Sequence, residues 1–157
     1  MSGRTEEVVK AVEEAFPGLV EEAKVLREKR VSLRVKPEAL LEVARYLRDH
    51  LGFDHPVSAG GVDLIKEGLL QMVYYVFSSK RRVLLMLKVN IPRDNPVLPT
   101  LTGVWGAMNP HEREAWEMFG IQFEGHPNLT HLLLPEDWEG GYPLRKDFKL
   151  RGRGVGH

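Results

Sequence analysis

Hydrophobic residues in the first part of the chain follow a helical spacing, then a strand-like one, then a helical one again. Over 5–16 and 37–51 they recur every three to four residues, which predicts two amphipathic helices. Pro17 ends the first helix. Pro37 suits the first position of the second, where the missing N–H of proline costs nothing. Between the helices, apolar and polar residues alternate over 31–35, which is typical of a half-buried strand.

Two strong strand candidates follow over 69–77 and 83–91. The short stretch between them fits a hairpin loop. The second candidate is almost wholly apolar, which predicts that both of its faces are covered. Residues 53–68 predict a further strand and a turn, in which we expect Asp63 and Lys66 to be exposed. This order of elements favours an α+β fold with helices on one face of a mostly antiparallel sheet.

The pattern changes after residue 91, where closely spaced prolines favour extended segments. One short helix is predicted over Pro110–Met118. Asn109 suits its N-cap and Glu112 completes a capping box, so Glu112 receives a structural role. On this helix we expect Trp116 and Phe119 to be buried.

The segment 119–148 is rich in Leu and Phe, although no further regular element is predicted in it. Such a segment either packs on its own domain or lies in a groove of a partner. We therefore expect an α+β domain over 1–91, followed over 92–157 by a proline-rich extended C-terminal arm with one short helix. The two parts together form one structural domain.

Composition excludes several classes of protein. The chain has no cysteine, which excludes disulfides, a thiol nucleophile and cysteine-ligated iron–sulfur clusters. Its 22 basic and 22 acidic residues give a net charge of zero, whereas nucleic-acid binders usually carry a basic excess. No apolar run is long enough to span a bilayer, and the N-terminus lacks the apolar region of a secretory signal, so a cytosolic protein is expected.

The neutral total hides an uneven distribution of charge. Residues 110–140 carry seven acids and one base, whereas residues 143–157 carry five bases and one acid. Two interpretations stay open: the basic tail folds back on the acidic stretch, or it meets a partner.

A stand-alone enzyme is the alternative from another class. A metal site would draw on several histidines and acids, namely His111, His126, His131, Glu112, Glu114 and Asp137. Their spacing does not support such a site, because His111-Glu112 is not followed by the second histidine of a zincin motif. There is also no nucleophile elbow, no dinucleotide-binding glycine motif and no phosphate-binding loop. The alternative therefore rests on His111, Glu114 and His126.

A family resemblance rests on five stretches of the C-terminal half. They are Glu-Arg-Glu-Ala-Trp-Glu-Met-Phe-Gly-Ile (112–121), Phe-Glu-Gly-His-Pro (123–127), Leu-Pro-Glu-Asp-Trp (134–138), Tyr-Pro-Leu-Arg-Lys-Asp-Phe (142–148) and the proline-rich 89–100. These closely resemble the 30-kilodalton subunit family of respiratory complex I, which is also called the C subunit of NADH-quinone oxidoreductase. Related subunits occur in membrane-bound energy-converting hydrogenases and their archaeal relatives.

The chain departs from the family pattern at three places. Tyr142 stands where members usually have His, Thr130-His131 stands where a basic pair is common, and the chain stops at His157. The short tail and the Gly-Gly-Tyr-Pro variant around Tyr142 are more similar to the archaeal or hydrogenase-type branch. The alternative function is thus the equivalent subunit of an archaeal-type energy-converting hydrogenase or a related ferredoxin-linked complex.

The resemblance implies a cofactor-free structural subunit in the hydrophilic arm of a membrane-bound oxidoreductase. Such a subunit is peripheral, lies on the cytoplasmic side of the cell membrane and contacts the membrane only through the complex. Its implied partners are a hydrogenase-like large subunit of the 49-kilodalton type and a small iron–sulfur subunit, and the clusters lie in the partners. No catalytic, cofactor-binding or metal residue is assigned in this chain. The implied interface residues are Arg113, Glu114, Trp116, Phe119, His126, Pro127, Trp138, Tyr142, Arg145, Lys146 and Asp147.

Arg145 is expected to make a geometrically demanding contact. Pro143 holds the chain extended, so Arg145 and Lys146 point to opposite sides. The planar guanidinium can then pair a carboxylate or backbone carbonyls through two donors.

Overall fold

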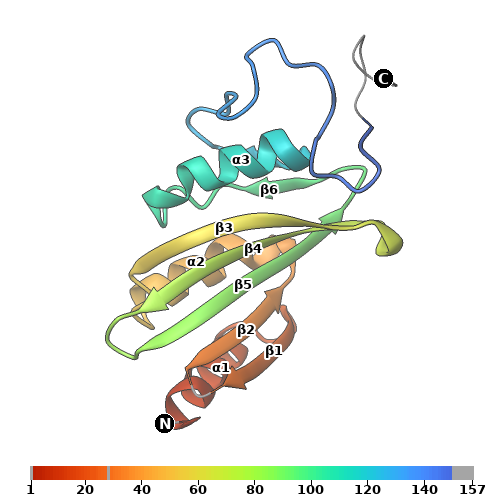
Figure 1. Cartoon of the computed structure of the whole chain (residues 1–157). Coiled ribbons are helices and arrows are strands. Elements are labelled where there is room, and N and C mark those ends of the chain that lie inside the picture. The colour runs from red at the N-terminus through yellow and green to blue at the C-terminus, as the bar shows by residue number, and fades with distance from the viewer. Residues whose placement is uncertain (1, 28, 150–157) are drawn as a thin grey trace.

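The computed structural model describes residues 2–27 and 29–149 (Figure 1). The elements over these residues run in the order α1 (Ser2–Ala15), β1 (Val20–Arg27), β2 (Arg30–Val35), η1 (Pro37–Ala39), α2 (Leu40–Asp49), β3 (His55–Leu64), η2 (Ile65–Glu67), β4 (Leu69–Ser78), β5 (Val83–Pro92), β6 (Val97–Pro99), η3 (Gly106–Met108), α3 (Asn109–Phe119) and β7 (Gln122–Glu124). The predicted helices and strands are all present, with ends that differ by a few residues.

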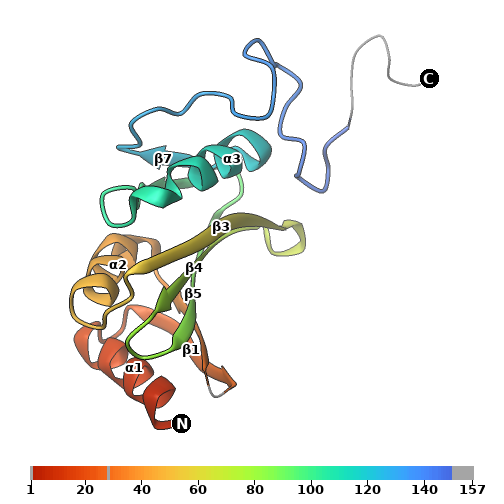
Figure 2. The same cartoon turned by 60° about the vertical axis from the view of Figure 1, so that its left-hand side comes forward.

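The main sheet has five strands in the order β1-β2-β5-β4-β3. Neighbouring strands pair antiparallel, except for β2 and β5, which pair in parallel. Helices α1 and α2 lie against one face of the sheet, and α3 lies beside β3 (Figures 1 and 2). The predicted α+β class with a mostly antiparallel sheet is confirmed.

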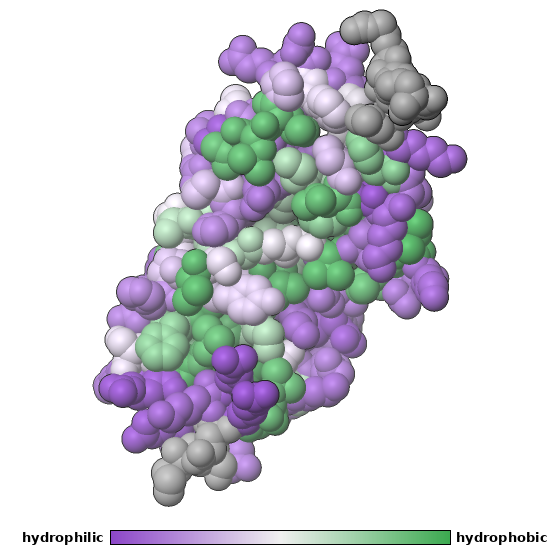
Figure 3. Space-filling model, viewed as in Figure 1, coloured by the Kyte–Doolittle hydropathy of each residue, from purple (hydrophilic) through white to green (hydrophobic). Residues whose placement is uncertain are grey.

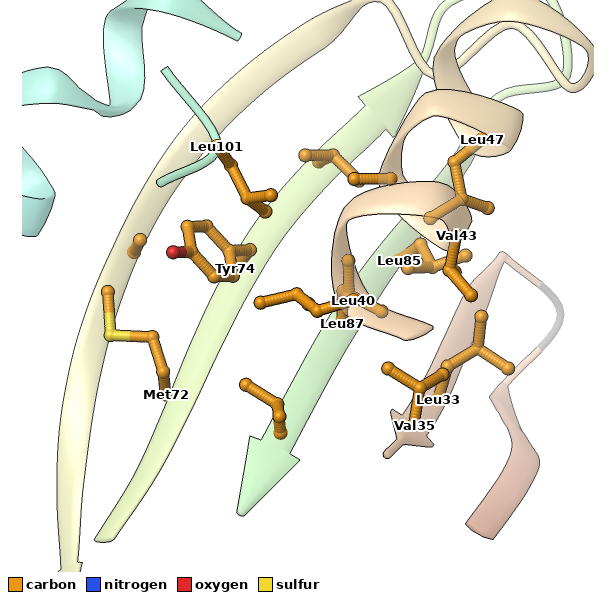
Figure 4. Packing of buried hydrophobic residues seen from close by; sticks show 14 of the residues in the cluster. Leu33, Val35, Leu40, Val43, Leu47, Met72, Tyr74, Leu85, Leu87 and Leu101 are labelled. Carbon is orange, nitrogen blue, oxygen red and sulfur yellow. The ribbon is translucent and has the colours of Figure 1, made fainter. Parts of the chain in front are cut away.

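Alternation along the central strands places the core on the helical face. In β5 every second residue, from Val83 to Ile91, is buried. These side chains meet the apolar stripe of α2, formed by Leu40, Val43 and Leu47 (Figure 4). The prediction that both faces of this strand are covered is wrong. The residues between the buried ones are only partly buried, because the helices all lie on the other face.

The edge strand β1 was not predicted from the sequence. Its second half is exposed, and charged residues interrupt the apolar alternation there. Its ladder with β2 also contains two register shifts. Charges and irregular pairing are common on edge strands, because they discourage pairing with other chains, and they also remove the strand signal from the sequence.

Residues after β5 extend the same core. Leu98, Leu101, Trp105 and Phe123 are buried in one hydrophobic cluster with the sheet and α2. The short strands β6 and β7, which were not predicted, pair in parallel and bring the two ends of this region together. Beyond β7, residues 125–149 contain no helix or strand.

Helix α3 extends one residue beyond its predicted range at each end. The predicted capping box is wrong: the helix begins at Asn109, and no side-chain hydrogen bond caps it. Gly120 ends the helix in the left-handed conformation, with φ of 83°, and its N–H donates to the carbonyl of Trp116. No helix within 2–27 or 29–149 is long and apolar enough to cross a membrane.

Candidate functional site

A buried carboxylate on α3 holds the segment 130–134. The side chain of Glu117 accepts hydrogen bonds from three consecutive backbone N–H groups: Leu132 at 2.6 Å, Leu133 at 2.8 and 3.0 Å, and Leu134 at 3.0 Å. Burial acts to raise the pKa of Glu117. The three backbone donors together outweigh this effect, so the pKa lies below its ordinary value.

Arg113, one helical turn earlier, holds the same segment from the side. Its guanidinium donates to the carbonyl of Thr130 at 3.2 Å, to the Thr130 hydroxyl at 3.0 Å and to the carbonyl of His131 at 3.3 Å. The ring of Trp116 lies against the His131 ring, with centroids 5.1 Å apart. One face of α3 therefore fixes both the backbone and a side chain of this segment.

The fixed backbone turns apolar side chains outward. Leu132 is 43% exposed and Leu133 is 60% exposed, although their own N–H groups are bound by Glu117. Figure 3 shows hydrophobic residues gathered over this end of the molecule, where the segment crosses α3. The described structure thus holds two exposed leucines on a backbone that α3 fixes in place.

A second segment, 142–148, is anchored at the C-terminal end of α3. Leu144 donates its N–H to the carbonyl of Met118 at 3.0 Å. Arg145 donates to the carbonyls of Phe119 at 2.7 Å and Arg93 at 3.3 Å, and its guanidinium lies 4.9 Å from the centre of the Tyr142 ring. The prediction that Arg145 uses its fork on two acceptors is confirmed, and both acceptors are backbone carbonyls. The prediction that the chain is extended here is wrong, because Arg145 and Phe148 donate their N–H groups back to the carbonyls of Tyr142 and Arg145 in consecutive turns.

Asp63 completes this anchor, and the prediction that it is exposed is wrong. It is buried at the end of β3, where it accepts two hydrogen bonds from Arg93, at 2.8 and 2.9 Å, and one from the Lys146 N–H at 2.6 Å. Arg93 also pairs with Asp147 at 2.7 Å. The Arg93 hydrogen bonds hold the pKa of Asp63 below its usual range. The acid is buried because a guanidinium and a backbone donor compensate its charge.

The described part of the basic tail folds back on the acidic stretch through backbone carbonyls, since Leu144 donates to Met118 and Arg145 to Phe119. Within residues 2–27 and 29–149, no ion pair joins a base of 143–149 to an acid of 112–139. The segment 142–148 is instead held through Asp63, Arg93 and the backbone of α3. The tail beyond residue 149 lies outside the described residues.

Between the two anchored segments lies a hollow of about 350 Å³. Its lining includes Trp116 and His131 on one side and Trp138 and Tyr142 on the other. The Trp138 indole N–H donates to the carbonyl of Gly141 at 2.7 Å, which closes a tight turn around its own ring. Four large side chains of this region therefore surround one hollow.

A second buried acid, Glu112, ties α3 to the sheet. Its carboxylate accepts from the Tyr74 hydroxyl at 2.7 Å, the Thr100 hydroxyl at 2.5 Å and the Leu101 N–H at 2.8 Å. Burial raises the pKa of Glu112 against the opposing effect of these donors. The sequence prediction of a structural role holds, but the partners lie on β4 and the loop after β6.

The residues of the enzyme alternative do not form a site. His126 uses both ring nitrogens locally, one beside the Asn109 carbonyl at 3.1 Å and one accepting the Asn128 N–H at 3.0 Å. Within the described ranges, no three His, Asp or Glu side chains are grouped so that they could hold a metal ion. His111 and Glu114 make no side-chain hydrogen bond to any described residue that would orient them for catalysis.

The predicted interface residues differ in their contacts and burial. Four of them hold the fold through side-chain contacts: Arg113, His126, Arg145 and Asp147. Phe119 is buried as predicted, against Gly61, whereas Trp116 is only partly buried. The side chains that reach the surface are Pro127, Tyr142, Lys146 and Asp147, while Glu114 and Trp138 are half-buried.

Sequence reasoning missed the residues that carry most of this geometry. Glu117, Leu132, Leu133 and Leu144 were not selected. One signal was available: a run of three leucines, 132–134, in a segment with no predicted element. Apolar residues that follow neither a helical nor a strand spacing either pack on their own domain or meet a partner, so this run was a signal to examine.

Comparison with known proteins identifies the family. Residues 33–154 match the family described as "Respiratory-chain NADH dehydrogenase, 30 Kd subunit". The chain belongs to this family. The matched range contains α2, α3, strands β3 to β7 and both anchored segments. The protein is thus a subunit of the complex I type, and the resemblance found in the sequence is confirmed.

Individual relatives agree with the family. The C subunit of the NADH-quinone oxidoreductase of a Roseiflexus species is 46% identical over 123 residues, covering 76% of this chain and 70% of the relative. The C subunit of the F(420)H(2) dehydrogenase of Methanosarcina mazei is 38% identical over 149 residues, covering 95% of this chain and 93% of the relative.

Two solved structures share the fold. A chain of the membrane-bound sulfane sulfur reductase, an archaeal respiratory membrane complex, superposes with a TM-score of 0.81 at 32% identity, covering 92% of this chain and 85% of that one. The trypsin-resistant fragment of Nqo5 superposes with a TM-score of 0.65 at 26% identity, covering 80% of this chain and 99% of that fragment.

Proposed function

We propose that this protein holds no cofactor and acts by position, in the hydrophilic arm of its complex on the cytoplasmic side of the membrane. It holds a hydrogenase-like large subunit and a small iron–sulfur subunit in the arrangement that electron transfer requires. The clusters lie in those partners. The absence of cysteine supports this role, because the chain has no thiolate to ligate a cluster.

The observation that carries the proposal is an apolar surface on a backbone that is already ordered. Leu132, Leu133, Tyr142 and Leu144 are among the most exposed large apolar side chains of the described residues, and they lie close together in sequence. Glu117, Arg113 and Arg145 hold the backbone beneath them, as the hydrogen bonds above describe. Ordering before docking reduces the entropy lost on association, so more of the binding free energy remains.

The predicted interface residues then divide by task. Arg113 and Arg145 shape the surface from below, and they contact the partner only indirectly. Tyr142 and Lys146 face outward and meet the partner directly. Leu132 and Leu133 join them at the interface.

The test replaces both leucines by serine, in the variant Leu132→Ser/Leu133→Ser, in a strain that carries a tagged large subunit. A leucine that is exposed in the isolated chain and buried in the complex contributes about 1.5–3 kcal/mol to binding. The variant is therefore expected to be strongly depleted from the purified complex. Quantitative mass spectrometry of the subunits measures the depletion.

The control is Val25→Ser/Leu26→Ser on β1, which is also an adjacent pair of exposed apolar residues. It is expected to assemble normally, and both variants are expected to keep the melting temperature of the isolated chain. Normal assembly of the leucine variant would contradict the proposal.

The comparisons also bear on which kind of complex, with which electron donor, contains this subunit. The Methanosarcina mazei relative matches nearly the full length of both chains, and its name is that of an F(420)H(2) dehydrogenase component. Together with the archaeal membrane complex, this supports a second candidate, the equivalent subunit of an archaeal-type energy-converting or ferredoxin-linked complex. Identification of the electron-input subunits in the purified complex decides between the two.

A further inference from the structure

The end of the sheet opposite the anchored segments carries a second hollow, of about 460 Å³. It lies on the outer face of the sheet, away from α2. Its floor is apolar and consists of Phe77 on β4, Leu84 on β5 and Val57, which is 51% exposed, on β3. None of the contacts that form the docking surface on α3 involves this end of the molecule.

Strand register brings Arg30 to one side of this floor and His55 to the other. Arg30 pairs with Leu84, Leu84 with Phe77, and Phe77 with His55, so one row across four strands runs from a cation over two apolar side chains to a histidine. The turns at this end add Lys29 to the rim.

Arg82 completes the rim, and its backbone is unusual. It is the one residue other than glycine in the described ranges with a positive φ, at 59°. Glycine or asparagine would adopt this left-handed conformation at lower cost. A position whose backbone favours glycine thus carries an arginine, and that arginine lies at the rim of the apolar hollow.

The charges of this rim are not compensated within the described residues. Lys29, Arg30 and Arg82 make no ion pair there, and no acidic side chain lines the hollow. Glu28, which precedes Lys29 in the sequence, lies outside the described residues. An apolar floor with a cationic rim is complementary to a segment that combines an apolar side chain with carboxylates.

We propose that this hollow binds an acidic segment of a neighbouring subunit, with an apolar side chain of that segment against Phe77 and Leu84. The inference rests on the proposed function only in that it needs a complex with further subunits. It gives the chain a second contact at the end opposite to the surface formed by Leu132, Leu133, Tyr142 and Leu144, the leucine surface.

A photocrosslinking residue at Val57 tests the contact in the assembled complex. It is expected to crosslink to one neighbouring subunit, through an acidic peptide of that subunit. A second probe at Leu133 reports on the proposed function separately. Crosslinking from Leu133 without crosslinking from Val57 would overturn the second contact and leave the proposed function intact.

Arg82→Gly separates strain from binding. Glycine relieves the positive φ, so the melting temperature of the isolated chain is expected to rise. Incorporation of the variant into the complex, in competition with wild type, is expected to fall about three- to fivefold. This is the change in binding expected when one charge is lost at the rim of an interface. Arg30→Glu is expected to reduce incorporation further. Lys66→Glu, with the same change of charge at an exposed turn far from the hollow, is expected to have no effect.

Three results would overturn the proposal. The first is unchanged incorporation of both Arg82→Gly and Arg30→Glu. The second is a Val57 crosslink to a second copy of this chain. The third is flotation of the purified chain with phosphatidylglycerol vesicles, but not with phosphatidylcholine vesicles, that is lost in Arg30→Glu, because the cations would then serve a lipid surface.

Discussion

Replacing Glu117 by glutamine tests the clamp that presents the leucine surface. The wild-type carboxylate offers two oxygens to the N–H groups of Leu132, Leu133 and Leu134. Glutamine keeps the shape of the side chain but offers one oxygen. Its NH₂ group must then face at least one backbone N–H, donor against donor. The substitution therefore removes both the charge and part of the acceptor capacity.

The size of the effect follows from the number of donors. A hydrogen bond to a charged group contributes about 1.5–3 kcal/mol, against about 0.5–1.5 kcal/mol for a neutral pair. Weakening two such bonds and leaving one donor opposed corresponds to about 2–4 kcal/mol for closing the segment. Global unfolding registers only part of this loss, because the segment can detach while the core stays folded.

Amide hydrogen exchange is thus the appropriate assay. About 2–4 kcal/mol corresponds to exchange that is roughly 30- to 1,000-fold faster at Leu132, Leu133 and Leu134. The melting temperature is expected to change far less. Glu114→Gln is the matched control, since Glu114 lies on the same helix and makes no hydrogen bond to a described residue. Exchange in the Glu117 variant equal to that of wild type would refute the clamp.

Further outcomes follow from other contacts. Glu112→Gln is expected to stabilise the chain more at about pH 7 than at about pH 4. Burial raises the pKa of Glu112 in the folded state, so the protonated carboxyl contributes to folding stability in acid, and this contribution is lost as the pH rises through that pKa. Equal effects of the substitution on thermal melts at the two pH values would contradict this. Gly61→Ala is expected to cost roughly 1–3 kcal/mol in denaturant unfolding, because the new Cβ would lie 2.7 Å from the Phe119 ring, whereas Gly60→Ala has no atom within 4 Å and should be nearly neutral. Arg145→Lys keeps the charge but removes the fork, and is expected to lower the free energy of unfolding by about 1–2 kcal/mol.

Local pattern predicted most of the fold because burial follows periodicity. The apolar residues spaced along α2 and the alternating apolar residues of β5 face the same core, and both spacings can be read from the sequence. Which faces remain open could not be predicted from β5 alone. An apolar strand looks the same whether helices cover both sides or a partner covers one. Strand β1 was not predicted because charged residues, which are common on an edge strand, interrupt its apolar alternation.

The candidate site was predicted in place but not in detail. The family motifs located the surface on α3 and the segments beyond it. The roles of individual residues depended on tertiary contacts that have no local signal. Asp63 and Arg93 are thirty residues apart and meet only because β3 and β5 end at the same corner of the sheet. A charged residue in a turn is exposed unless such a partner arrives.

The parallel β2–β5 pair has a consequence for the order of folding. Val31 and Leu33 pair with Leu85 and Leu87, so the N-terminal hairpin has no sheet to join until β5 has been synthesised. Pairing between distant segments is slow and leaves apolar strands exposed in the meantime. Any truncation before β5 therefore leaves the N-terminal hairpin without the strand that joins it to the rest of the sheet.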